Sequence, residues 1–221
     1  MVKLISYTQT GPWIKDTMDL QGIVAYCARV SNPSNQSNTE TNEKLIKYLI
    51  KNKHWSPFEM VSICLEINTT RDIARQILRH RSFSFQEFSQ RYADPTKDLN
   101  FVFKEARLQD TKNRQNSIEV DDTGLQLSWE TQQDYVIHAA KRAYEWAIQN
   151  GIAKEQARAV LPEGIMESRI YMNGTLRSWI HYIELRSGNG TQKEHREIAL
   201  QCVDAISPIF PMITDFVCND S

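Results

Sequence analysis

Basic side chains gather in one short stretch of a chain whose charges are otherwise balanced. Between positions 71 and 91 the acidic residues are Asp72 and Glu87. Arginine suits phosphate because its planar guanidinium can donate two N–H groups to two oxygens at once. The stretch therefore predicts a site for a phosphorylated small molecule, with a solvated helix face carrying surface ion pairs as the alternative. Its basic residues are Arg71, Arg75, Arg79, His80, Arg81 and Arg91.

Three of these arginines have the spacing of a helix. Arg71, Arg75 and Arg79 stand four residues apart, so a helix would stack them along one side. The residues that follow, 79–91, combine basic groups with hydroxyls, an amide and a carboxylate. The phenylalanines interleaved among them can anchor the backbone while the polar groups face a ligand.

The segment 79–91 resembles the signature of the flavin-dependent thymidylate synthases, Arg-His-Arg-x-x-Ser-x-Asn-x-x-Ser-x-Arg. Every fixed position matches except Gln86, where the family more often has Asn. A match of this length is far more specific than a lone glycine motif. Thr175 and Gly190 also stand where other members can have Asn and His.

The resemblance extends along most of the chain. Residues 54–59, His-Trp-Ser-Pro-Phe-Glu, resemble the family's flavin segment, and Gln76 precedes the signature by three residues as a nucleotide-contacting Gln does. Residues 157–162 resemble the segment whose arginine meets the nucleotide. Residues 176–186 resemble the late helix that contacts flavin and nucleotide.

The resemblance implies two overlapping sets of site residues. One catalytic residue is implied, Arg186, because an arginine near the pyrimidine carbonyl stabilises negative charge as it develops on the ring. The dUMP-binding set is Gln76, Arg79, Glu87, Phe88, Ser89, Gln90, Arg91, Arg158 and Arg186. The FAD-binding set is His54, Ser56, Glu59, Arg79, His80, Arg81, Arg177 and His181.

The resemblance also implies an activity. The family converts dUMP to dTMP, with 5,10-methylenetetrahydrofolate as carbon donor and NADPH as reductant through FAD, and it uses no enzyme cysteine as nucleophile. It stacks the uracil on the flavin and assembles active sites from several subunits of a homotetramer. We therefore expect a methyltransferase of this type, with small-molecule substrates and neither nucleic acid nor membrane as partner.

Cysteine and histidine usage favours a reduced protein without a metal. The four cysteines are far apart, contain no Cys-x-x-Cys pair and lie outside the arginine-rich stretch, so we expect structural thiols in an intracellular, cytoplasmic protein. The five histidines form no His-x-x-x-His pair, so we expect no metal site. The hydroxyl of Ser89 could act as a nucleophile, but the sequence does not indicate a general base beside it. The cysteines are Cys27, Cys64, Cys202 and Cys218.

Hydrophobic periodicity predicts the elements that must position these groups. We expect strands over 2–8, 61–68 and near 169–172, and a polar, irregular excursion over 105–123. Asp16 and Thr17 precede a helical pattern that extends to Val30. Further helices are expected over 43–53, 70–78, 129–149, 154–160, 176–185 and 192–206. One α+β domain over 1–221 follows, and the resemblance implies a helix-rich fold with a small antiparallel sheet.

Composition leaves two alternatives to this reading. The first is a phosphate- or nucleic-acid-binding protein that uses the arginine-rich segment without catalysis. The formal charge of −1, from 26 basic and 27 acidic residues, weighs against it because polyanion binders have broad basic surfaces. The second is a flavoprotein that keeps the site but acts on another pyrimidine nucleotide, and only an assay separates it.

Overall fold

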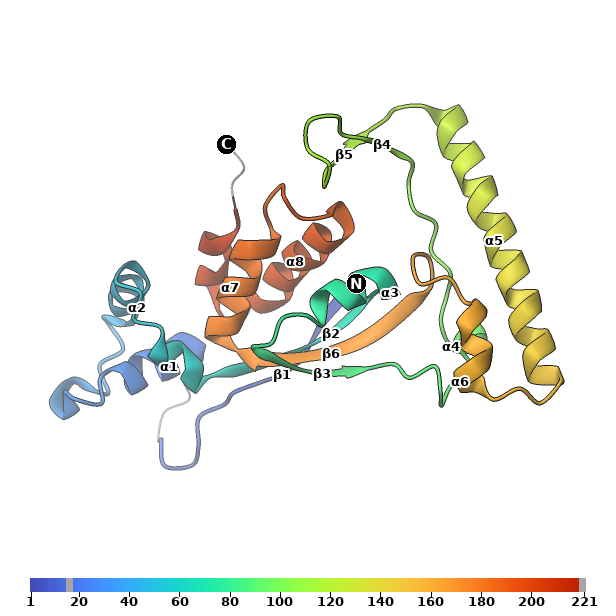
Figure 1. Cartoon of the computed structure of the whole chain (residues 1–221). Coiled ribbons are helices and arrows are strands. Elements are labelled where there is room, and N and C mark those ends of the chain that lie inside the picture. Colours follow the sequence, from blue (N-terminus) through green and yellow to red (C-terminus); the bar gives the residue numbers. More distant parts are fainter. Residues whose placement is uncertain (15–17, 219–221) are drawn as a thin grey trace. The chain divides into compact units, whose positions relative to one another are not determined.

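The fold is known from a computed structural model that describes residues 1–14 and 18–218 (Figure 1). The chain divides into two compact units. The first unit contains Met1–Ile67, His80–Phe85 and Tyr171–Ser221, and the second contains Asn68–Arg79 and Gln86–Ile170. A single domain over 1–221 stays a prediction.

A four-stranded sheet has the order β1-β2-β6-β3, from β1 (Val2–Tyr7), β2 (Ser62–Thr70), β6 (Glu167–Thr175) and β3 (Phe83–Glu87). β1 pairs antiparallel with β2, with Leu4 opposite Leu65. In β2 the predicted alternation is confirmed, since Ile63, Leu65 and Ile67 are fully buried. The predicted class, a helix-rich α+β fold with a small antiparallel sheet, is confirmed.

Helices accompany the strands in the first unit, and the last of them contacts β1. They are α1 (Leu20–Ala28), α2 (Asn42–Lys51), α7 (Leu176–Arg186) and α8 (Lys193–Ile206), with 3₁₀ turns η1 (Pro33–Asn35), η2 (Ser56–Met60) and η4 (Pro211–Phe216). Asp19 caps α1 by accepting the Gly22 N–H at 2.7 Å. Asp16 and Thr17, expected before this helix, lie outside the described residues. Trp179 of α7 is buried, and its Nε1–H donates to the Ile63 carbonyl at 3.0 Å.

The second unit is built around one long helix, α5 (Thr123–Gln149) (Figure 1). Its shorter elements are α3 (Arg71–Ile77), α4 (Pro95–Asp98), β4 (Arg107–Gln109), β5 (Ser117–Glu119), α6 (Lys154–Ala157) and η3 (Arg158–Val160). Tyr144 of α5 packs with Leu161 and Met166 in a buried cluster. Gly151, with φ of 76°, follows the helix and provides the left-handed residue that ends it.

Several elements differ from the sequence-based expectation. The excursion over 105–123 contains an antiparallel hairpin, β4–β5, and α5 begins at Thr123 rather than at 129. Asp122 explains the early start, because its carboxylate accepts the Leu125 N–H at 2.9 Å and caps the helix. β3 was not predicted, because its residues were interpreted only as a binding segment.

No helix among residues 1–14 and 18–218 is long and apolar enough to cross a membrane.

The approach of Gly174 to Phe83 within the first unit gives a stability prediction. A Cβ at position 174 would lie 2.4 and 2.6 Å from ring carbons of Phe83, far inside contact distance. Gly174→Ala should lower the free energy of unfolding by about 1–3 kcal/mol, because the buried ring must move. Urea unfolding followed by circular dichroism measures the change.

The matched control is Gly190→Ala, where an added Cβ meets nothing within 4 Å. We expect it to change stability by less than about 1 kcal/mol. Equal effects of the two substitutions would contradict the packing explanation.

Candidate functional site

In the first unit, η2 and α7 contact each other and bring part of the expected flavin set together. Ser56 begins η2, and Pro57 at the next position suits the first turn of such a helix. Glu59, one turn later, forms an ion pair with Arg177 of α7. Residues that are more than a hundred positions apart in the sequence are therefore neighbours.

Aromatic contacts position two of the three histidines of the expected flavin set. The ring of His181 meets Trp55 edge-on, with centroids 5.0 Å apart, and His54 lies 6.1 Å from Tyr48. Both histidines remain exposed. Trp55 and Tyr48 were not among the expected site residues. Trp55 could have been found, because it stands inside the segment 54–59.

Arg186, at the end of α7, contacts another expected residue of the first unit. Its Nε–H donates a hydrogen bond to Nε2 of His80 at 3.0 Å. The ring of His80 also packs edge-on against Tyr182, with centroids 5.0 Å apart. Burial raises the pKa of the Tyr182 phenol well above its ordinary value, so this side chain is neutral at physiological pH.

In the second unit, Glu155 of α6 links two residues of the expected nucleotide set. Its carboxylate lies 3.7 Å from Nε of Arg91, and its backbone carbonyl accepts the Nε–H of Arg158 at 3.3 Å. Two guanidinium groups from segments far apart in the sequence therefore share one neighbour. Glu155 was missed by sequence reasoning, and only the tertiary fold reveals it.

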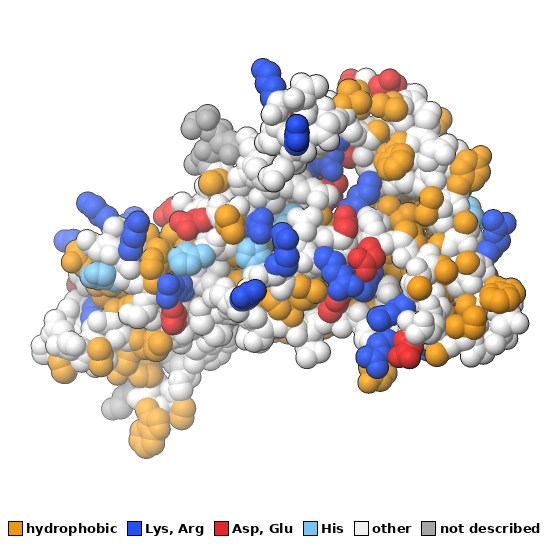
Figure 2. Space-filling view, viewed as in Figure 1, with side chains coloured by type: hydrophobic (Ala, Val, Ile, Leu, Met, Phe, Trp, Pro, Cys, Tyr) orange, Lys and Arg blue, Asp and Glu red, His pale blue; other side chains and the backbone are white. Residues whose placement is uncertain are grey.

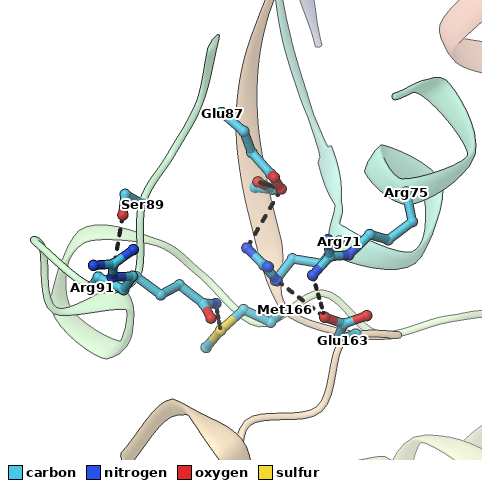
Figure 3. A network of polar contacts seen from close by, with 9 residues as sticks. Arg71, Arg75, Glu87, Ser89, Arg91, Glu163 and Met166 are labelled. Atoms are coloured by element: carbon cyan, nitrogen blue, oxygen red, sulfur yellow. Dashed lines mark hydrogen bonds and ion pairs between the residues drawn. The ribbon is translucent and has the colours of Figure 1, made fainter. Parts of the chain in front are cut away.

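Arg71 and Arg75 of α3 are occupied by carboxylates of the second unit (Figure 3). Arg71 is buried, with its guanidinium 3.5 Å from Glu87 and 3.7 Å from Glu163, and Arg75 donates to Glu163 at 2.9 Å. The bond from Arg75 lowers the pKa of the Glu163 carboxyl. The half-exposed pair of Arg75 and Glu163 agrees with the surface-ion-pair alternative, whereas buried Arg71 does not. The expected stack is shorter than predicted, because α3 ends at Ile77, before Arg79.

In the middle of the signature, Glu87 points toward Arg71 (Figure 3), and the side chain of Gln90 is buried. The amide of Gln90 is 4% exposed and donates to the sulfur of Met166 at 3.2 Å. Glu87 accepts the hydroxyl of Ser168 at 2.9 Å, and the Phe88 N–H donates to the Arg169 carbonyl at 2.8 Å. The side chain of Gln90 therefore points into the protein in this conformation.

Two arginines of the signature differ from those that carry ion pairs. Arg79 of the second unit and Arg81 of the first are exposed. Neither side chain makes a hydrogen bond or ion pair with any residue in the ranges 1–14 and 18–218. Gln76 is half-buried on α3, and Ser89 accepts the Arg91 N–H at 3.4 Å. Both exposed guanidinium groups can therefore accept an anionic ligand without first losing a protein partner.

Comparison with known proteins agrees with this geometry. Residues 13–212 match a family model described as thymidylate synthase complementing protein. The "Probable flavin-dependent thymidylate synthase" of Paramecium bursaria Chlorella virus 1 is 47% identical over 96% of this chain and 95% of its own. The chain belongs to the family of flavin-dependent thymidylate synthases.

Two further comparisons are consistent with that family. The flavin-dependent thymidylate synthase of Synechocystis sp. is 46% identical over 96% of both chains. The crystal structure of a UMP/dUMP methylase, PolB, from Streptomyces cacaoi bound with 5-Br UMP has a TM-score of 0.80 at 24% identity, covering 98% of this chain and 94% of that one. This second likeness shows that the fold is shared.

The donor set of the first unit fits the flavin of this family. A flavin dinucleotide carries a pyrophosphate, which guanidinium, hydroxyl and imidazole groups can bind through N–H and O–H donors. The exposed side chains of His54, Ser56, Arg81 and His181 supply such donors on or beside η2, β3 and α7. Arg177 is half-buried against Glu59, so it can orient a ligand from a fixed position.

Cysteine chemistry in the described residues agrees with a family that uses no enzyme thiolate. Burial raises the pKa of Cys27, Cys64 and Cys202, which keeps these thiols protonated at neutral pH. Cys218 is exposed, and its Sγ lies 3.6 Å from the Glu184 carbonyl. Within residues 1–14 and 18–218, no three His, Cys, Asp or Glu side chains gather as metal ligands.

The burial of Arg71 gives a second stability prediction. Glu163→Gln removes one of the two carboxylates that balance this guanidinium, so we expect a loss of about 1–3 kcal/mol in the free energy of unfolding. The pKa of Glu163 is lowered by folding, so its contribution is present above its ordinary pKa and fades as the pH falls below that value. The difference between wild type and variant should therefore shrink in acid, as measured by urea unfolding at several pH values.

Glu155→Gln is the control, since its pair with Arg91 is more than half exposed on both sides. Such a pair is worth less than about 1 kcal/mol. A loss from Glu163→Gln no larger than that of the control would show that Arg71 does not depend on it.

Proposed function

We propose that this protein methylates C5 of dUMP to give dTMP, with 5,10-methylenetetrahydrofolate as the carbon donor. The observation that carries the proposal is the match to this enzyme family over residues 13–212, together with relatives 46–47% identical over nearly the whole of both chains. NADPH is the proposed reductant, and FAD, when bound, supplies its reducing equivalents to the reaction.

Arg186 is the residue that we assign to catalysis. C5 of uracil is a weak nucleophile, and it becomes a better one when negative charge on the ring is stabilised. A guanidinium beside a pyrimidine carbonyl supplies that stabilisation most strongly when it is fixed in place beforehand. The bond from Arg186 to His80 and its half-buried position support this role.

The phosphate of dUMP is assigned to the arginines of the second unit. Arg91 and Arg158 converge on Glu155, and Arg79 is exposed. Bidentate donation from such groups suits a phosphate dianion. The remaining nucleotide set, Gln76, Glu87, Phe88, Ser89, Gln90 and Arg186, is proposed on the family signature. Ser89 is assigned to binding rather than attack, because the described contacts give it no base.

The FAD contacts are proposed for the set that the resemblance implied: His54, Ser56, Glu59, Arg79, His80, Arg81, Arg177 and His181.

A homotetramer with shared active sites is proposed as the working assembly. Support comes from α5, which buries one face and leaves large apolar side chains exposed on others, where Figure 2 shows hydrophobic groups gathered. Exposed apolar groups in such number mark an interaction surface. The exposed side chains are Leu127, Trp129, Tyr135, Val136 and Trp146.

Tritium release from C5-labelled dUMP tests the activity and the role of Arg186 together. We expect release to require methylenetetrahydrofolate, NADPH and FAD, with dTMP as product. Arg186→Ala should lower turnover about 100- to 1,000-fold, because the charge on the ring loses its stabilising group. The flavin absorbance of the purified variant should remain, and retained turnover would remove Arg186 from the mechanism.

The tritium-release assay and two binding measurements decide between the proposal and its alternatives. Turnover of UMP in preference to dUMP would assign the site to another pyrimidine nucleotide. A protein that never binds FAD, makes no dTMP and binds oligonucleotides with length-dependent affinity would be a nucleic-acid-binding protein instead. The pairing of Arg71 and Arg75 with carboxylates argues against that outcome.

A cysteine-free variant tests the absence of a thiolate nucleophile. Replacing Cys27, Cys64, Cys202 and Cys218 by Ala or Ser should leave dTMP formation measurable, since no step is assigned to a thiol. Circular dichroism must show that the variant folds, because Cys202 is fully buried. Loss of all dTMP formation in a folded, flavin-containing variant would contradict the prediction.

A further inference from the structure

Behind the guanidinium of Arg186, half-buried His80 lies beside the buried side chains of Tyr182 and His195 in the first unit. Nε2 of His80 accepts the Arg186 Nε–H at 3.0 Å. Tyr182, one turn before Arg186 on α7, is 1% exposed and stands edge-on to His80, with ring centroids 5.0 Å apart. The Tyr182 hydroxyl lies 3.1 Å from Nε2 of His195, a fully buried residue of α8.

The hydrogen bond fixes the protonation state of His80. Arginine has only donors, so Nε2 of His80 must present a lone pair to the Arg186 Nε–H. The imidazole is therefore neutral, with its proton on Nδ1. A protonated His80 would lose this bond and would place two positive charges in contact.

Packing holds the imidazole in place. The ring of Tyr182 that contacts His80 is itself packed against Phe83 and Trp179, with centroids 6.0 and 5.9 Å apart. His195 also faces His80, with ring centroids 6.4 Å apart. Side chains of α7 and α8 therefore hold the imidazole of His80, which accepts the hydrogen bond from Arg186.

A guanidinium is planar, so anchoring Nε at a known distance limits where the two terminal nitrogens can lie. In the described part of the chain, neither terminal nitrogen of Arg186 bonds to a protein group, which leaves both for a ligand oxygen. We propose that His80 is a positioning residue, whose neutral imidazole orients the guanidinium of Arg186 toward the pyrimidine base. This inference rests on the proposed function, and it gives the side chain of His80 a role other than the flavin contact implied by the resemblance.

Two substitutions at His80 separate hydrogen bonding from bulk. His80→Gln can place an amide oxygen near the position of Nε2 and keep an acceptor for Arg186, whereas His80→Leu cannot. We expect kcat for dTMP formation to fall about 10- to 100-fold in His80→Leu, as for loss of a charge-assisted hydrogen bond, and about threefold or less in His80→Gln. KM for dUMP should change less than kcat.

The Arg186→Lys background tests the coupling directly. Lysine has no Nε–H in the position of the guanidinium, so His80→Leu should cost little further activity there. Additive losses from the two substitutions would overturn the inference. The pH profile is a second readout: kcat of wild type should fall in acid as His80 takes up a proton, and this limb should weaken in His80→Gln. Among residues 1–14 and 18–218, Arg186 and Tyr182 from α7 and His195 from α8 are titratable groups that face His80.

Calorimetric titration measures the affinity for dUMP without requiring turnover, so it tests the role of His80 separately from the proposed function. His80→Leu should weaken dUMP binding several-fold while flavin absorbance and the melting temperature stay near wild type. If wild type makes no dTMP, the proposed function fails, and the affinity series still decides the role of His80. Loss of flavin in both His80 variants, or unchanged kcat and unchanged affinity in a folded His80→Leu, would overturn the inference.

Discussion

Arginine keeps its positive charge at every physiological pH, so each guanidinium that folding removes from water must meet an acceptor. This constraint organises the second unit, where Arg71 is buried between Glu87 and Glu163 and Arg75 shares Glu163. The strand β3 and the segment before β6 are tied to α3 through these pairs. The network that stabilises the unit therefore also places the signature segment.

The same constraint separates supporting arginines from binding arginines. Arg71 and Arg75, which are matched by carboxylates, support the fold, whereas Arg79 and Arg81 keep their donors for solvent or a ligand. Arg186 is intermediate, because a neutral imidazole accepts its Nε–H without cancelling its charge. A carboxylate in the place of His80 would have oriented the guanidinium equally well, but it would also have reduced the positive potential available to a developing anion.

Much of the fold and part of the site followed from the sequence, because the relevant signals are local. Alternation in β2 and helical spacing in α7 and α8 were visible in runs of ten residues, and the signature spans thirteen. The features that could not be predicted depend on tertiary contacts. Nothing in the sequence distinguishes Glu163 and Glu155 from other glutamates, and their roles follow from their contacts with Arg71 and Arg91. The start of α5 was missed because capping by Asp122 outweighs a weakly periodic first turn.

Because Gly174 lies so close to Phe83, substitutions at these two positions should depend on each other. The bulky ring belongs to the signature segment, and the gap that receives it belongs to β6, so a change of size at either position disturbs the packing of the other. A related sequence with a larger side chain at position 174 should carry a smaller one at position 83. Covariation of positions 83 and 174 among related sequences would then indicate that the binding segment packs against β6 in the same way in each of them.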